Sequence, residues 1–269
     1  MKPLILITND DGVFSPGLRA AAEAVAGLGE LIIAAPRHQQ TGMSRALRAD
    51  TGEDLIEQAT IQVNGRAHPA YGIHATPALV VVYAAVAIAP RPPDLCISGI
   101  NYGENIGMTI SASGTVGAAL EAAVIGIPAL AVSRGAPIEL HGAPDYRDLD
   151  WSAARRVTRL LAERILRLGL PPGTDVLNVN VPAGATEHTE IRPTVQSRQR
   201  HVYFTRPQQQ DAAQGPALSL ANLVDRATLE PDSDIQAFLI DNVVSVSPLT
   251  ARSAAPATPH DLLRYVSRE

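Results

Sequence analysis

The sequence lacks the features that are typical of disulfide-bonded proteins and of proteins that bind duplex nucleic acid. Its 269 residues include one cysteine and 4% aromatic residues, and no block of consecutive basic residues is present. A single cysteine excludes an internal disulfide. The formal net charge is −5, so the chain lacks the basic footprint of a protein that binds duplex nucleic acid. We therefore expect no duplex nucleic acid partner.

Long apolar runs are missing as well. The longest, residues 78–89, is too short to span a bilayer, and the apolar segment before Asp10 is too short for the core of a signal peptide. Cys96 lies inside an apolar run, where it is expected to be a small buried hydrophobe, and this fits a reducing compartment. With 46% hydrophobic and 18% charged residues, the chain reads as a soluble globular protein. We expect it to be cytoplasmic, with no membrane partner.

The first two-thirds of the sequence alternate strand-like apolar runs with helical patterns. Strands are expected at residues 4–8, 31–35, 94–98 and 129–133, and helices at residues 16–28, 77–89, 113–125 and 151–168. Ser15 is a candidate N-cap for the first helix. The second helix is apolar nearly all round, which predicts that it is sandwiched in the core. This alternation predicts an α/β fold with a doubly wound, mostly parallel sheet.

The pattern changes after residue 175. Strands are expected at residues 176–181, 189–194 and 235–246, a polar and mobile loop at residues 208–234, and a terminal helix at residues 261–266. We therefore expect a single domain over residues 1–269, with a core of residues 1–175 and a β-rich C-terminal extension of residues 176–269.

A polar cluster, Asn9-Asp10-Asp11-Gly12, directly follows the first expected strand. Consecutive side chains of a strand point to opposite faces, but a turn relaxed by Gly12 can aim both carboxylates at the sheet edge. Two adjacent carboxylates suit Mg²⁺ or Mn²⁺, and their mutual repulsion favours a cation between them. The alternative is an ordinary turn, since turns favour Asn, Asp and Gly.

The segment from Ser98 to Gly107 follows another expected strand and is rich in glycine and asparagine. It is predicted to be a flexible loop whose backbone approaches a ligand closely. Asn101 offers a carbonyl oxygen to a metal, and Asn105 an amide to a phosphate or hydroxyl. A plain surface loop is the alternative interpretation.

Ser113-Gly114-Thr115 opens the third expected helix. The N-terminus of a helix attracts anions, and Gly114 has no side chain to block their approach. Simple N-capping is the alternative. A phosphate cradle next to metal ligands indicates phosphoryl transfer, whereas the G-x-G-x-x-G and G-x-x-x-x-G-K-[ST] patterns are missing.

Residues 7–12, 98–107 and 113–116 together resemble, in order and spacing, the SurE family of metal-dependent 5′/3′-nucleotidases. The resemblance covers about the first 135 residues most firmly. It implies a Rossmann-like fold and one divalent metal ion, Mg²⁺ or Mn²⁺. It further implies hydrolysis of nucleoside monophosphates and other phosphomonoesters, in a homodimer or homotetramer that exchanges a C-terminal element between subunits.

Carried over to this sequence, the resemblance makes Asp10 and Asp11 catalytic and assigns the metal to Asp10, Asp11, Thr41 and Asn101. It assigns the phosphate to Asn9, Asn105, Ser113, Gly114 and Thr115. Thr41 stands where the family has a serine, and it keeps the hydroxyl. Leu79 replaces an acidic residue of the family, and Arg198 or Arg200 is a candidate for holding substrate.

The expected mechanism is attack by metal-activated water on the phosphate, with the helix that begins near Ser113 stabilising the developing charge. The general acid is not evident. His38 is one candidate, and a surface histidine without a catalytic task is the alternative. Two other functions remain open, a sugar- or nucleotide-using transferase on the same fold and a protein that binds nucleotides without hydrolysing them.

Overall fold

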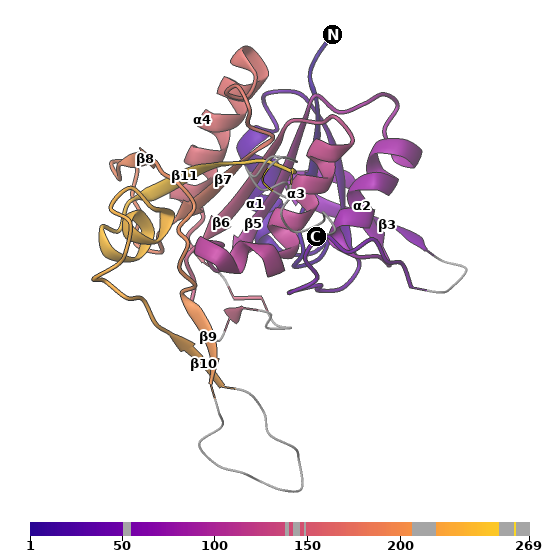
Figure 1. Ribbon diagram of the computed structural model, residues 1–269. Coiled ribbons are helices and arrows are strands. Elements are labelled where there is room, and N and C mark those ends of the chain that lie inside the picture. The colour runs from indigo at the N-terminus through magenta and orange to yellow at the C-terminus, as the bar shows by residue number, and fades with distance from the viewer. Residues whose placement is uncertain are drawn as a thin grey trace, which may run out of the picture.

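The computed structural model describes residues 1–50, 55–137, 140–141, 146–147, 149–205, 219–252 and 261. Within them the core is a nine-stranded sheet with the order β3-β4-β2-β1-β5-β6-β7-β11-β8 (Figure 1). Its strands are β1 Leu4–Thr8, β2 Glu30–Pro36, β3 Ile56–Val63, β4 Arg66–Ile73, β5 Leu95–Tyr102, β6 Ala129–Arg134, β7 Val176–Val181, β8 Ile191–Pro193 and β11 Val244–Leu249. The strands from β4 to β7 in this order are parallel. The predicted α/β, mostly parallel fold is confirmed.

Helices cover both faces of the sheet. The helices are α1 Pro16–Val25, α2 Pro77–Tyr83, α3 Gly114–Val124 and α4 Ser152–Leu168. Side chains of β1 alternate between two apolar cores, because Ile5 and Ile7 pack with residues of α1 and α4, whereas Leu6 packs with residues of α2 and α3. Ser15 caps α1 as predicted, accepting a hydrogen bond from the Gly17 N–H at 3.2 Å.

The prediction that the second helix is sandwiched in the core is wrong. Helix α2 ends at Tyr83 and continues as a π-helical turn, Ala84–Ile88, in which Val86 is 78% exposed. Only one side of this segment contacts the sheet, so its apolar residues on the other side reach the surface. Apolar composition all round a helix therefore did not reveal which side was covered.

The hairpin of β3 and β4 was not predicted. The two strands pair antiparallel over their full length, and the turn between them is Asn64-Gly65, with φ of 49° and 75°. An Asn-Gly pair between two short strand-like runs is the typical sequence signal for a type I′ hairpin, so the signal was present.

The C-terminal section shares the main sheet. Strands β7, β11 and β8 extend it, and a separate ribbon of β9 Val202–Thr205 and β10 Ser219–Asn222 projects from the body (Figure 1). The expected strand at residues 235–246 is wrong in its first half, which forms a π-helical turn, Gln236–Ile240, before Asn242 (φ 53°) turns the chain into β11. Exchange of this section between subunits stays a prediction. Residues 208–218 and 262–266 lie outside the described residues.

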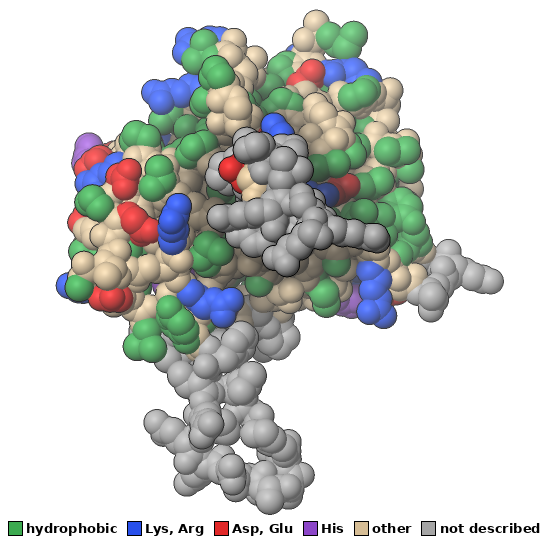
Figure 2. All heavy atoms as spheres, in the orientation of Figure 1, with side chains coloured by type: hydrophobic (Ala, Val, Ile, Leu, Met, Phe, Trp, Pro, Cys, Tyr) green, Lys and Arg blue, Asp and Glu red, His purple; other side chains and the backbone are tan. Residues whose placement is uncertain are grey.

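The charges and apolar segments of the structure agree with the composition. On the face in Figure 2, basic and acidic side chains are interspersed, and no large patch of one sign is visible there. No helix in the described part of the chain is long and apolar enough to cross a membrane. Cys96 is a buried free cysteine, as predicted.

We expect Gly17 to control how closely α1 packs on β5. A Cβ at Gly17 would lie 1.9 Å from the backbone oxygen of Ile100, whereas one at the exposed Gly27 would meet nothing closer than 3.5 Å. Gly17→Ala should therefore lower the free energy of unfolding by about 2 kcal/mol, and Gly27→Ala should change it little. Urea denaturation of both variants measures this. Equal stabilities of the two variants would contradict the tight packing.

Candidate functional site

Three strand ends meet at one edge of the sheet. Strands β2, β1 and β5 are neighbours and parallel, so the segments that follow them lie together. The loop after β2 is tied to the turn after β1 by a 2.7 Å hydrogen bond from the Gln40 N–H to the Asp10 carbonyl. A cavity of about 330 Å³ opens here, and residues predicted for the site line it: Asp10, Thr41, Asn101, Asn105 and Ser113.

The turn after β1 is shaped by Asn9. Its side-chain oxygen accepts a hydrogen bond from the Gly12 N–H at 3.1 Å, and its amide nitrogen donates to the Gly12 carbonyl at 3.3 Å. Asn9 is fully buried and does not line the cavity, and Gly12 has a φ of 111°. The side-chain polar atoms of Asn9 are thus used in forming the turn, and its assignment to the phosphate stays a prediction.

The segment predicted as a flexible loop after residue 98 is mostly strand at first. Strand β5 continues to Tyr102, with a register shift against β6 between Ser98 and Asn101. At Gly99 a Cβ would lie 2.2 Å from the Val132 carbonyl, so the close pairing requires glycine. A short loop and a 3₁₀ helix, Gly107–Ala112, complete the segment. The segment is a strand in spite of its polar composition because β5 pairs with both β1 and β6.

The carboxylates of Asp10 and Asp11 are almost completely buried, with exposed fractions of 3% and 2%. Burial raises the pKa of Asp10 to about 6, although a hydrogen bond of 2.5 Å from the Thr115 hydroxyl opposes this shift. Burial, and secondly the charge of Asp10, raises the pKa of Asp11 well above its usual range. Among the described residues, neither carboxylate has a basic side-chain partner. Two buried like charges therefore lack a counter-ion.

The surrounding donors fit a hard divalent cation. Asn101 donates its amide hydrogens to the carbonyls of Tyr102 and Gly103, at 3.2 and 2.8 Å, which leaves its side-chain oxygen as the remaining polar group. Thr41 brings a hydroxyl to the same cavity. Within the described residues, no three His, Cys, Asp or Glu side chains are grouped in a way that could hold a metal ion. The donor set is thus two carboxylates with neutral oxygens, which suits Mg²⁺ or Mn²⁺ better than zinc. The metal roles stay predictions.

The start of α3 is directed at Asp10 more than at the cavity. A Cβ at Gly114 would lie 2.7 Å from the Asp10 Cβ, so glycine allows the helix to approach the carboxylate. Thr115 is fully buried, and its hydroxyl donates to Asp10 Oδ1. Ser113 lines the cavity and caps the helix, accepting from the Val116 N–H at 3.1 Å. Thr115 therefore contacts the Asp10 carboxylate through its hydroxyl, and its assignment to the phosphate stays a prediction.

Asn105 is held by residues that the sequence analysis did not assign. Its side-chain nitrogen donates to Ser133 Oγ at 2.9 Å, and its N–H donates to Asn180 Oδ1 at 2.7 Å. Its carbonyl accepts from the side chains of Asn178 and Asn180, at 2.8 and 3.0 Å. Two asparagines at alternate positions of the apolar strand β7 were the available signal, because buried polar side chains need partners.

Further cavity residues come from distant parts of the chain. Four residues without a predicted site role line the cavity: Glu104, Thr109, His141 and His201. Of the two candidate arginines, Arg200 lines it and Arg198 does not. The proposed acid His38 packs against His74, with ring centroids 5.7 Å apart, and does not line the cavity. Leu79 packs against the apolar core of α2 and α3.

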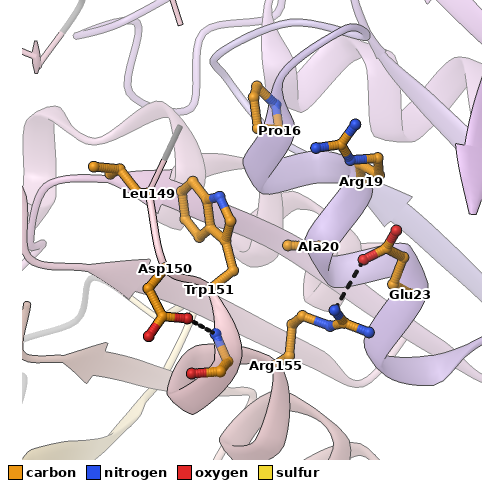
Figure 3. Close-up of a pocket in the computed structure, with 9 residues that line it drawn as sticks. Pro16, Arg19, Ala20, Glu23, Leu149, Asp150, Trp151 and Arg155 are labelled. Carbon is orange, nitrogen blue, oxygen red and sulfur yellow. Dashed lines mark hydrogen bonds and ion pairs between the residues drawn. The ribbon is translucent and has the colours of Figure 1, made fainter. Parts of the chain in front are cut away.

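A second hollow, of about 260 Å³, lies between α1 and the start of α4 (Figure 3). Arg155 pairs with Glu23 there at 3.1 Å, and Asp150 accepts from the Ser152 N–H at 2.9 Å. None of the predicted site residues lines it. The cavity at the sheet edge is therefore the candidate functional site.

Comparisons with known proteins identify the family of this chain. The family model described as Survival protein SurE matches residues 5–203. The 5′-nucleotidase SurE of Methanosarcina barkeri is 36% identical over 99% of this chain and 98% of its own, and that of Methanothermobacter thermautotrophicus is 45% identical over 71% of each chain. The crystal structure of the SurE protein from Aquifex aeolicus has a TM-score of 0.74 and 28% identity, covering 98% of both chains. The chain therefore belongs to the SurE family.

Proposed function

We propose that this protein is a metal-dependent phosphomonoester hydrolase that removes phosphate from nucleoside 5′- or 3′-monophosphates. The observation that carries the proposal is the buried pair Asp10 and Asp11, without a basic partner among the described residues, beside a cavity with neutral oxygen donors. Relatives that span nearly the whole chain are named 5′-nucleotidases, and metal dependence is a general property of the family.

The residues of the site have separate proposed roles in metal binding, phosphate binding and positioning. Asp10, Asp11, Thr41 and Asn101 would hold one divalent cation, Mg²⁺ or Mn²⁺. Such a cation lowers the pKa of a bound water and neutralises a phosphate oxygen. Ser113 and Asn105 then bind the phosphate from the cavity wall, and Gly114 lets the positive end of α3 come close. Thr115 positions the Asp10 carboxylate.

The proposal extends to assembly and location. We propose that the protein is a homodimer or homotetramer, and the projecting ribbon of β9 and β10 supports this (Figure 1). We also keep a cytoplasmic location, supported by the lone buried cysteine.

The direct test is phosphate release from nucleoside 5′- and 3′-monophosphates with Mg²⁺ or Mn²⁺. A chelator should abolish release, and added metal should restore it. Asp10→Asn should lower kcat/KM at least about 100-fold, because several kcal/mol of transition-state stabilisation are lost. The exposed Asp232→Asn is the matched control and should retain activity. Activity that survives chelation and Asp10→Asn would refute the proposal, and tight nucleotide binding without release would favour a non-hydrolytic binder.

Without metal, Asp11→Asn should make the protein more stable at pH 7.5. The folded-state pKa of both carboxyls is raised, so their ionisation removes stability as the pH rises from about 4 through about 6 and beyond. Removing one charge should raise Tm by at least about 3 °C in chelator. The difference should disappear near pH 4 and reverse in saturating metal. Thermal unfolding across pH measures this, and a less stable metal-free variant at pH 7.5 would contradict it.

Thr115→Val should weaken metal binding about tenfold, because the Asp10 carboxylate loses the donor that orients it. Thr158→Val is a matched control, since the buried Thr158 hydroxyl donates to the Ala154 carbonyl within α4. Calorimetric titration with Mn²⁺ gives the affinities. If Thr115 instead held the phosphate, KM would rise while metal affinity stayed constant.

A further inference from the structure

The cavity wall contains a carboxylate that phosphate chemistry does not need. Glu104 follows β5 in the chain and stands directly before Asn105, and its side chain is 9% exposed. A carboxylate repels a phosphate group, so it cannot serve as a phosphate ligand. It is an acceptor, and the part of a substrate that suits it is a neutral group with hydrogens to donate.

Glu104 is fixed by a buried histidine from a distant segment. His201, whose side chain is 3% exposed, lies with Nε2 at 3.3 Å from Glu104 Oε1 and with Nδ1 at 3.2 Å from Thr109 Oγ1. Thr109 donates its hydroxyl hydrogen to the Ile106 carbonyl at 2.6 Å. The hydroxyl therefore presents a lone pair to His201, and Nδ1 must carry a hydrogen.

Glu104 is an acceptor in this arrangement. Nε2 of His201 lies within reach of Glu104 Oε1, so the imidazole orients the carboxylate. Burial alone would raise the pKa of Glu104, but the hydrogen bond from His201, together with smaller effects that include nearby His141, holds it below its usual value. Asp234 is a second carboxylate near His201, and Arg200 lines the same cavity. Glu104 is thus an ionised acceptor whose orientation is set.

We infer that Glu104, held in place by His201, is a specificity-determining residue that accepts hydrogen bonds from the sugar hydroxyls of a nucleotide. The inference rests on the proposed function, because it takes the phosphate to be bound by the neighbouring Asn105 and Ser113. A ribose is the hydroxyl-bearing group next to the phosphate of a nucleoside monophosphate, and acidic side chains recognise ribose hydroxyls in this way elsewhere. The site therefore selects ribonucleotides over analogues that lack these hydroxyls.

The test compares two ligands on the same protein. The probes are the 5′-phosphonate analogues of a ribonucleoside monophosphate and of its 2′,3′-dideoxy counterpart. Both contain a C–P bond that is not hydrolysed, and binding is measured with Mg²⁺ present. The wild-type protein should bind the ribose analogue at least about tenfold more tightly, the difference expected for a charge-assisted hydrogen bond. Glu104→Gln should lower this ratio to about two, and His201→Gln should lower it in the same direction.

Glu187→Gln is the matched control. Glu187 also lies near a histidine, His188, at 3.5 Å, but the two side chains are 76% and 87% exposed. This variant should keep the wild-type ratio. Because the ratio compares two ligands on one protein, a general loosening of the fold does not move it.

The outcomes separate the inference from the proposed function. A wild-type ratio near one, or an unchanged ratio in Glu104→Gln, overturns the role of Glu104 even if nucleotides are hydrolysed. Failure to release phosphate from the natural nucleotides overturns the proposed function, whereas a ratio that depends on Glu104 still supports sugar recognition.

Discussion

The burial of two adjacent carboxylates is the constraint on which the site depends. Asp10 and Asp11 lie at the end of a central strand, almost without solvent, and each raises the cost of ionising the other. Their surroundings reduce this cost without cancelling it. Thr115 donates to Asp10, and the Tyr102 N–H and Gln39 lie at 3.4 Å from the Asp11 carboxylate. These contacts come from neutral donors, and the proposed function therefore places a divalent cation beside the pair.

The architecture around this pair follows from the same need. A cation can reach buried carboxylates only at an open edge, and the carboxyl ends of β2, β1 and β5 provide that edge. Close approach of other elements then requires glycine, at Gly114 beside Asp10 and at Gly17 where α1 meets β5. Under the proposed function, a cation bound to this pair would stabilise the fold.

Much of this arrangement could be predicted from the sequence, because it depends on local patterns. Local signals predicted the first strand from the apolar run before Asp10 and the first helix from the N-cap Ser15. Polar residues that follow such strands were in turn predicted to meet at one edge, where Asp10, Asn101 and Asn105 line the cavity. Side-chain direction is not local. Nothing near Thr115 in the sequence shows that its hydroxyl points to Asp10, and Asn9 uses its amide within the turn because burial leaves it no other partner. The path of residues 235–249, with a helical turn before β11, likewise depends on packing that apolar composition does not encode.

Buried carboxylates at this cavity differ in their role according to the side chains that contact them. Among the described residues, Asp10 and Asp11 are buried beside neutral donors only, and the proposed function balances their charges with a cation. Glu104 is buried beside His201, which orients it, and the carboxylate lines the cavity as a hydrogen-bond acceptor. Under the proposals above, a cation bound near Asp10 would attract a phosphate, whereas Glu104 would accept hydrogen bonds from hydroxyl groups. Placed along one cavity, the two arrangements match the two ends of a nucleoside monophosphate, a charged phosphate and a neutral sugar. The difference between them comes from a histidine almost a hundred residues away from Glu104 in the chain, which only the fold brings into contact.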